Sequence, residues 1–325
     1  MINIKFPFFH NNSMSYSLIN SKVQNESETV GIKPENNITK YSKESSKRQD
    51  AKFTIFPTGM FISAFFFFLT IVVFASIPDL RNLHGKCLMC NLIGLDIFYF
   101  TLTMIQVYND QMMDVSLLCY FAAYTTYFTL FIAFVWLSIV SFDLCRRFTN
   151  ISYNSKEKSF KTYAIIGFGT SIFCTVLVFI IDNFQLLPQK YLPRIALYRC
   201  WVSKELIVEL IYIYIPMSAL AFSYVGFFVV TFYKIWKAQK KSNDILSQKA
   251  ALKSRLYTFT RLFMVMGVSW CCETFSYVFG KDLLIFEITD VFNSLIGLFT
   301  FIIVCILNPT TRNLIIERLR NFNKN

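Results

Sequence analysis

The residues of this chain with the greatest capacity for chemistry are nine cysteines and two histidines, and their spacing argues against a metal centre. The cysteines form no paired CxxC motifs and no Cys/His pattern of the kind that binds zinc. His10 lies in a polar segment and His84 in a short connection, so neither is placed to act as a buried general base. The sequence therefore predicts no metal site, no cofactor and no enzymatic activity.

Acidic residues inside apolar segments are the second group with chemical potential. Asp96, Glu209, Glu273 and Asp290 interrupt four different apolar runs, and Asn293 shares a helical face with Asp290. Charges within a membrane are costly, so these residues mark either a polar ligand pocket or static hydrogen bonding between helices. The sequence alone leaves both interpretations open.

Seven apolar runs must position these residues. They lie at 55–77, 88–109, 115–140, 162–181, 205–233, 256–279 and 285–307, and each can cross about 30 Å of hydrocarbon as a helix. Lipid cannot hydrogen-bond free backbone groups, and the runs lack the alternation of a membrane barrel. The chain is 54% hydrophobic and 16% charged, which excludes an ordinary soluble domain. We predict an all-α membrane protein with a seven-transmembrane helix bundle.

Composition divides the chain into three parts. Residues 1–53 form a polar tail rich in Asn, Ser and Lys, which we predict to be disordered and extracellular. Residues 54–308 form the seven-helix domain, and residues 309–325 form a cytoplasmic tail. Apolar and basic residues interleave over 308–320, which predicts a short amphipathic helix on the inner leaflet.

The distribution of Lys and Arg predicts the orientation in the membrane. With an external N-terminus, the inner loops and C-terminal tail hold 18 basic residues and the outer loops hold 5. The N-terminal tail carries eight more, five of them close to the first span, which favours the opposite insertion. We expect the N-terminus outside, in agreement with three N-glycosylation sequons at Asn11, Asn25 and Asn37.

Two cysteines fall on the predicted outer side. Cys119 lies at the outer end of the third run, and Cys200 lies in the loop 182–204 before the fifth. Both face the oxidising compartment, and a bridge would hold this loop over the bundle mouth with a stabilisation on the order of 3 kcal/mol. The alternative is two unpaired thiols.

Three residues weaken the helices in which they lie. Pro216, Gly267 and Gly297 fall in the fifth, sixth and seventh runs. Proline removes a helical hydrogen bond, and glycine loosens both packing and backbone. These positions are the predicted hinges if the bundle has two states, although a static kink is equally consistent with the sequence.

Three motifs and one dipeptide resemble those of the insect Methuselah-like receptors, a branch of the secretin-type (class B) seven-helix receptors. The motifs are LRNLHGKCLMC at 80–90, VWLSIVSFDLCRRF at 135–148 and RLFMVMGVSWCCE at 261–273. The dipeptide Cys200-Trp201 is similar to one that secretin-type receptors place in this outer loop, with its cysteine bonded to the third helix, here Cys119. The resemblance extends over about residues 53–320.

The resemblance implies a G-protein-coupled receptor of the plasma membrane. Its partners would be a heterotrimeric G protein, an extracellular peptide or small molecule, and membrane lipids. The sixth helix would move outward to open an inner crevice, and Trp201 would join the polar residues on the ligand side. Coupling residues at the inner mouth would be Asp143, Arg146, Arg147, Arg255 and Arg261. Because the basic residues follow the membrane topology, nucleic acid is not an expected partner.

The sequence also departs from the family pattern. Family members usually carry a large cysteine-rich extracellular domain, whereas the tail before the first apolar run contains no cysteine. A truncated, non-signalling decoy receptor is therefore one alternative. A second is an insect chemoreceptor-like ligand-gated channel, whose N-terminus lies inside, and a third is a transporter, which should show internal repeats. Glycosylation of Asn25 or Asn37 would separate the receptor from the channel.

Overall fold

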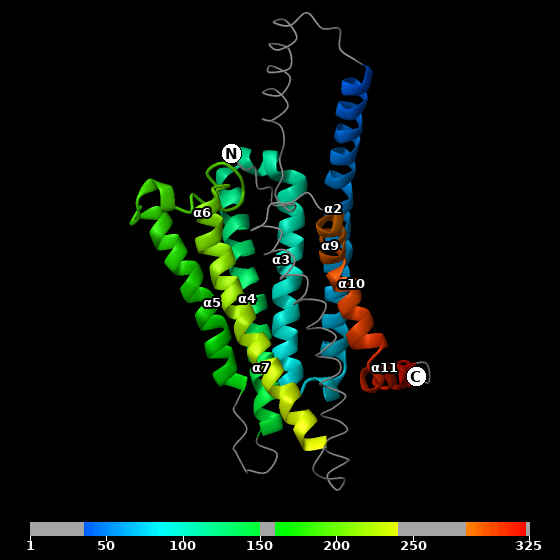
Figure 1. Ribbon diagram of the computed structural model, residues 1–325. Helices are drawn as coiled ribbons and strands as arrows, with labels where there is room; N and C mark the ends of the chain where they lie inside the picture. The colour runs from blue at the N-terminus through cyan, green and yellow to red at the C-terminus, as the bar shows by residue number, and fades with distance from the viewer. Residues whose placement is uncertain (1–35, 150–159, 240–283, 323–325) are drawn as a thin grey trace, which may run out of the picture.

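The computed structural model describes residues 36–149, 160–239 and 284–322, and every regular element within these ranges is helical (Figure 1). The long helices are α2 (Asn36–Ser76), α3 (Leu83–Asp114), α4 (Ser116–Thr149), α5 (Phe160–Asn183) and α7 (Ile215–Gln239). The helical segment ending in α7 starts with α6 (Leu206–Glu209) and a π-helical turn, η4 (Leu210–Tyr214). The last part contains α9 (Leu284–Ser294), α10 (Ile296–Phe301), π-helical η5 (Ile302–Ile306) and α11 (Pro309–Phe322). Short 3₁₀ turns are η2 (Pro78–Leu80) and η3 (Gln189–Tyr191).

Within the described ranges, five helical segments are long and apolar enough to cross a membrane. They are Ile55–Ser76, Leu83–Asp114, Ser116–Arg146, Phe160–Asn183 and Leu206–Lys234. A sixth span results if the bent pair Ile288–Ser294 and Ile296–Ile306 is counted as one. These segments agree with six of the seven predicted runs. The remaining run, 256–279, lies outside the described residues.

The centre of the helix bundle is α4, which packs against α3, α5 and α7 (Figure 1). In the 18-residue apolar stretch of α4, 78% of the residues are buried, whereas 17% are buried in the corresponding stretch of α5. The largest side chains that are fully buried, Trp136 and Tyr127, both belong to α4. α4 is therefore surrounded mainly by other helices. The exposed apolar side chains of α5 are suited to contact with lipid.

The last span is interrupted rather than continuous. α9 and α10 are bent by 62° at a break, where Leu295 leaves the helical conformation with φ −103° and ψ 12°. The predicted run 285–307 thus covers a bent pair of helices, with the break two residues before Gly297. A break in a helix frees backbone N–H and C=O groups, which need other partners inside a membrane protein. Those partners come from α2 and α3, described below.

Candidate functional site

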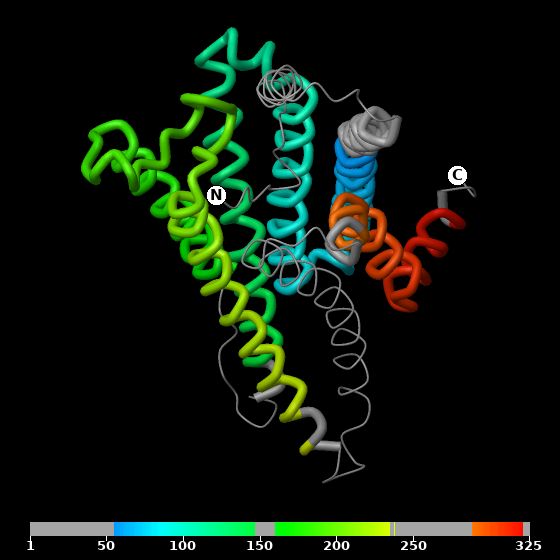
Figure 2. Tube along the Cα trace, turned by 45° about the horizontal axis from the view of Figure 1, so that its top comes forward, coloured from blue at the N-terminus to red at the C-terminus, as the bar shows by residue number. Residues whose placement is uncertain are grey.

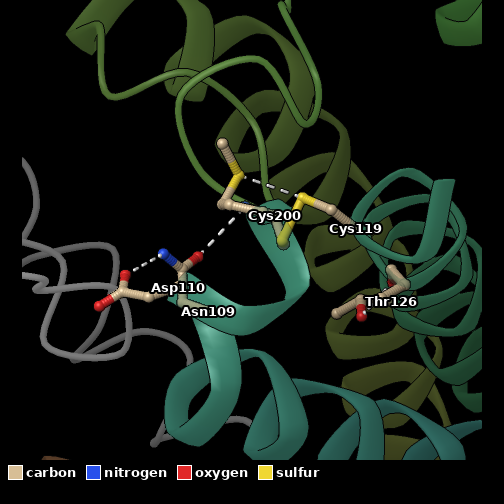
Figure 3. Close-up of a disulfide and its surroundings, with 7 residues drawn as sticks. Asn109, Asp110, Cys119, Thr126 and Cys200 are labelled. Carbon is tan, nitrogen blue, oxygen red and sulfur yellow. Dashed lines mark hydrogen bonds between the residues drawn. A yellow bond between two sulfur atoms is a disulfide. The ribbon is translucent and has the colours of Figure 1, made fainter. Parts of the chain in front are cut away.

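At the end of the bundle predicted to be the outer one, a disulfide joins Cys119 and Cys200 (Figure 3). Cys119 lies in the first turns of α4 and Cys200 in the loop before α6, with 4.8 Å between their Cα atoms and both side chains fully buried. Asn109, just beyond a kink in α3 at Tyr108, accepts the Cys200 N–H through its Oδ1 at 3.3 Å. The predicted bridge is confirmed, and the loop is tied to α3 as well as to α4.

A second attachment of the same loop was not predicted from the sequence. Asp182, in the last turn of α5, accepts the backbone N–H groups of Arg194 at 2.8 Å and Ile195 at 3.0 Å. The Tyr124 hydroxyl of α4 donates to the same carboxylate at 3.4 Å. The sequence feature that could have indicated this attachment is a carboxylate, Asp182, at the end of an apolar run and directly before a loop. Between these attachments, the green loop after α5 lies at the outer edge of the molecule, away from α2 (Figures 1 and 2), and only its later part returns toward the bundle.

The later part of the loop inserts a buried cation beside α6. The Arg199 Nη2 lies 2.5 Å from Glu209 Oε1, and the Arg199 Nε donates to the Val202 carbonyl at 2.8 Å. Both charged residues are buried, with 9% of Arg199 and 3% of Glu209 exposed. Burial lowers the pKa of the Arg199 guanidinium from its ordinary value, and the nearby Glu209 carboxylate opposes this shift. Glu209, a predicted member of the polar network, thus forms an ion pair with Arg199 of the loop.

Trp201 covers the upper part of the bundle next to this ion pair. Its ring is buried and its centroid lies 6.5 Å from that of Tyr127 on α4. The Tyr127 hydroxyl donates to the Tyr212 carbonyl in η4 at 3.0 Å. In an α-helix that carbonyl would accept the N–H of residue 216, which is a proline without one. The predicted hinge Pro216 therefore lies two residues after a π-helical turn, and the Tyr212 carbonyl in that turn accepts a hydrogen bond from α4.

The break in the last span is held together by two side chains from other helices. The Ser63 hydroxyl of α2 donates to the Ser294 carbonyl at 2.6 Å and accepts the Gly297 N–H at 3.0 Å. The Tyr99 hydroxyl of α3 donates to the Asn293 carbonyl at 2.9 Å. These are backbone groups that an unbroken helix would pair internally. The predicted hinge Gly297 thus lies at the observed bend; whether the bend moves remains a prediction.

The predicted polar network is distributed over several helices. Asp290 and Asn293 are buried in α9, Glu209 pairs with Arg199, and Asp96 is half-buried in α3. Glu273 lies outside the described residues, together with Gly267. A common cavity for these side chains stays a prediction.

At the opposite end of the bundle, which is predicted to be the inner one, a polar cluster joins α4 and α5. The Tyr163 hydroxyl of α5 donates to Asp143 Oδ1 at 3.1 Å, and only 2% of Asp143 is exposed. Arg146, one turn further along α4, is half-buried and also interacts with the Tyr163 hydroxyl. Asp143 is thus engaged within the bundle, and Arg146 is the more accessible of the two.

Other predicted residues lie beyond what the structure describes. Arg255, Arg261, Asn11 and Asn25 are outside the described residues. Arg147 and Asn37 fall inside α4 and α2, but their side chains are not described. The predicted tail boundary at residue 53 lies within α2, which begins at Asn36.

Comparison with known proteins identifies the family of this chain. The sequence model of the family described as 7 transmembrane receptor (Secretin family) matches residues 51–300. The chain belongs to this family. As a secretin-family receptor it is a multi-pass protein of the plasma membrane, and the matches do not favour the chemoreceptor-like channel.

The relatives of this secretin-family receptor include several fly proteins. It is 31% identical over 274 residues to "G-protein coupled receptor Mth2" of Drosophila simulans, covering 80% of this chain and 50% of the relative. It is 30% identical over 284 residues to "Probable G-protein coupled receptor Mth-like 10" of Drosophila melanogaster, covering 80% and 48%. The chain therefore spans about half the length of the curated relatives it matches.

Proposed function

We propose that this chain is a Methuselah-like G-protein-coupled receptor, which transmits an extracellular signal to heterotrimeric G proteins by rearranging its helices. Its ligand is a peptide or small molecule that binds from the side of Cys200 and Trp201. The proposal is supported by membership of the secretin family and by the similarity to fly proteins named as G-protein-coupled receptors. It includes an extracellular N-terminus.

The observation that carries the proposal is the placement of two polar assemblies at opposite ends of α4. Cys119 binds the outer loop near the start of this helix, and Asp143 binds Tyr163 near its end. Cys119 and Asp143 are 24 positions apart in the sequence, which corresponds to about 36 Å at the helical rise and is close to one membrane thickness. One buried helix thus connects a ligand-side loop to a coupling-side cluster.

The coupling side uses charge at the inner mouth. Asp143 acts as a positioning residue that holds α4 against α5, and Arg146 contacts the G protein, with Arg147, Arg255 and Arg261 as further candidates. The sixth helix moves outward to open the crevice that receives the G protein. Ligand and G protein each bind the open state more tightly, so each strengthens the binding of the other.

Complex formation tests the proposal without knowledge of the ligand. Membranes containing the tagged receptor are mixed with purified heterotrimers of the main Gα classes, and nucleotide is removed enzymatically to favour the receptor-bound G protein. We expect one class to co-purify and to be released by GTP. No release by GTP, or no co-purification with any class at normal surface expression, would contradict the proposal and favour the decoy alternative.

Two variants localise the coupling surface. Arg146→Glu is expected to reduce co-purification at least fivefold at unchanged surface expression, because the arginine becomes an acidic side chain at the inner mouth. Arg81→Glu makes the same exchange in the exposed turn between α2 and α3 and serves as the matched control. Equal losses in the two variants would point to a general effect of inner-surface charge.

The orientation is tested separately. Epitope tags at both ends, read in intact and permeabilised cells, report the side of each terminus. We expect the N-terminal tag and glycans on Asn25 or Asn37 outside. An N-terminal tag that stains only after permeabilisation would overturn the topology.

A further inference from the structure

The loop after α5 exposes large apolar side chains at the edge of the bundle. Phe184 is 70% exposed, Leu186 is 62% exposed, and Leu187 is also exposed. This segment belongs to the outer loop, which would ordinarily face water. Apolar side chains gathered on one exposed surface mark an interaction site.

Phe184 continues the lipid-facing stripe of α5. Phe173, Leu177 and Ile180 are all exposed on that helix, and Phe184 extends their spacing by one more turn. The Phe184 N–H donates to the Ile180 carbonyl at 3.0 Å, so the helical direction persists to this residue. The apolar surface that α5 turns to lipid therefore does not end where the span ends.

The chain then turns back instead of rising into water. Gln185 has a positive φ of 49°, and the Leu186 N–H donates to the Ile181 carbonyl at 3.3 Å. This left-handed residue followed by a six-to-one bond is the geometry of a Schellman helix end. It holds Leu186 beside the last turn of α5, three residues after the candidate span ends at Asn183.

The neighbourhood has the chemistry of a lipid interface. Tyr191 is exposed, and the Lys190 Nζ lies 5.9 Å from its ring centroid. Tyrosine is enriched where hydrocarbon meets headgroups, and lysine can extend its ammonium to the headgroups from an apolar surface. The Tyr191 carbonyl accepts the Tyr212 hydroxyl at 2.9 Å, which ties this part of the loop to η4.

We propose that residues 184–187 insert into the outer leaflet of the bilayer, so that the loop carrying Cys200 is anchored in lipid as well as by its disulfide and Asp182. The continuity of Phe184 with the lipid-facing stripe of α5 selects lipid over a protein partner. The inserted segment holds the first half of the loop at the edge of the bundle. Asp182 and the disulfide hold the second half against the helices.

Quenching of a fluorophore at single positions tests the lipid contact. Phe184→Cys and Leu186→Cys are each labelled with a nitrobenzoxadiazole maleimide and reconstituted in phosphatidylcholine liposomes. Gln189→Cys, an exposed polar position in the same loop, is the matched control, and the parent chain labelled in parallel supplies the background. Quenchers are phosphatidylcholine with a nitroxide high on its acyl chain, and aqueous iodide.

We expect nitroxide lipid to quench positions 184 and 186 at least threefold more than position 189, and iodide to show the opposite order. Strong iodide quenching at 184 and 186 without lipid quenching would place the segment in water and overturn the proposal. Protection from both quenchers would also overturn it, because a second copy or another protein would then cover the segment. The assay needs no signalling, so its failure is distinct from failure of the receptor function.

Discussion

Ser63 and Gly297 contact each other across the break in the last span, although they are 234 residues apart. The Gly297 N–H donates to the Ser63 hydroxyl at 3.0 Å, and a β-carbon on Gly297 would overlap the Ser63 backbone carbonyl. The close approach of α2 and α10 therefore requires glycine at this position. It also allows one serine to satisfy backbone groups on both sides of the bend.

The first prediction concerns this contact. Gly297→Ala should destabilise the folded receptor by about 1–3 kcal/mol, because the added methyl group forces α10 away from α2. Gly226→Ala is the matched control, since a β-carbon there meets no atom within 4 Å and alanine favours the helix. Thermal unfolding of the purified variants in the same detergent measures the difference. Similar midpoints for both variants would show that the contact is not tight in solution.

The second prediction concerns the disulfide. Cys119→Ser should remove about 2–4 kcal/mol of stability and reduce surface delivery, because the loop loses its covalent attachment to α4. Cys174→Ser, which alters a partly buried free cysteine on α5, should leave delivery near the parent level. Flow cytometry of intact cells with an N-terminal tag reads both. Normal delivery of the Cys119 variant would count against a structural role for the bridge.

The third prediction concerns the buried ion pair. Arg199→Met should cost about 3–5 kcal/mol, because Glu209 remains buried without its partner. Adding Glu209→Leu should recover much of this loss, since the uncompensated carboxylate is removed. Arg194→Gln breaks the more exposed pair with Glu205, at 3.6 Å, and should cost less than about 1 kcal/mol. Unfolding midpoints of the single and double variants give the coupling energy, which should be large only for the buried pair.

The fourth prediction concerns the carbonyl that Pro216 leaves free. Tyr127→Phe should cost about 1–3 kcal/mol, because the buried Tyr212 carbonyl loses its hydroxyl donor. Pro216→Ala returns a backbone N–H four residues after that carbonyl, so the same Tyr127→Phe change should cost less in this background. A double-mutant cycle on thermal stability measures the coupling. An equal loss of stability from Tyr127→Phe with and without Pro216→Ala would show that the Tyr127 hydroxyl does not compensate for the missing N–H of Pro216.

Several features were predictable because they depend on local composition. The runs 55–77 and 162–181 match Ile55–Ser76 and Phe160–Asn183 closely, since apolar length alone requires a membrane helix. Cys119 and Cys200 were candidates for a bridge because both lay on the predicted outer side, and the family resemblance implied their pairing. Gly297 and Pro216 were recognised as weak points from residue type alone, and both lie at irregular helix geometry.

Other features depended on partners that are remote in the chain. The break at Leu295 directly follows Asn293 and Ser294, but its stabilising hydroxyls come from Ser63 and Tyr99 on other helices. The sequence left open whether Glu209 belongs to a ligand pocket or to static hydrogen bonding, and the structure places Arg199 of the loop against it. No spacing rule within one helix reveals such pairings.

Hydrophobic length, readable in the sequence, determined that this protein crosses the membrane as helices, and the positions of the cysteines indicated a disulfide at one end of the bundle. The reason is that lipid accepts no unpaired backbone group, so each long apolar segment must satisfy its own hydrogen bonds as a helix. Tertiary structure decided where those helices bend, because a broken helix is tolerated only where neighbouring side chains can replace the lost backbone partners. Ser63, Tyr99 and Tyr127 occupy those places, and only the folded arrangement brings them there.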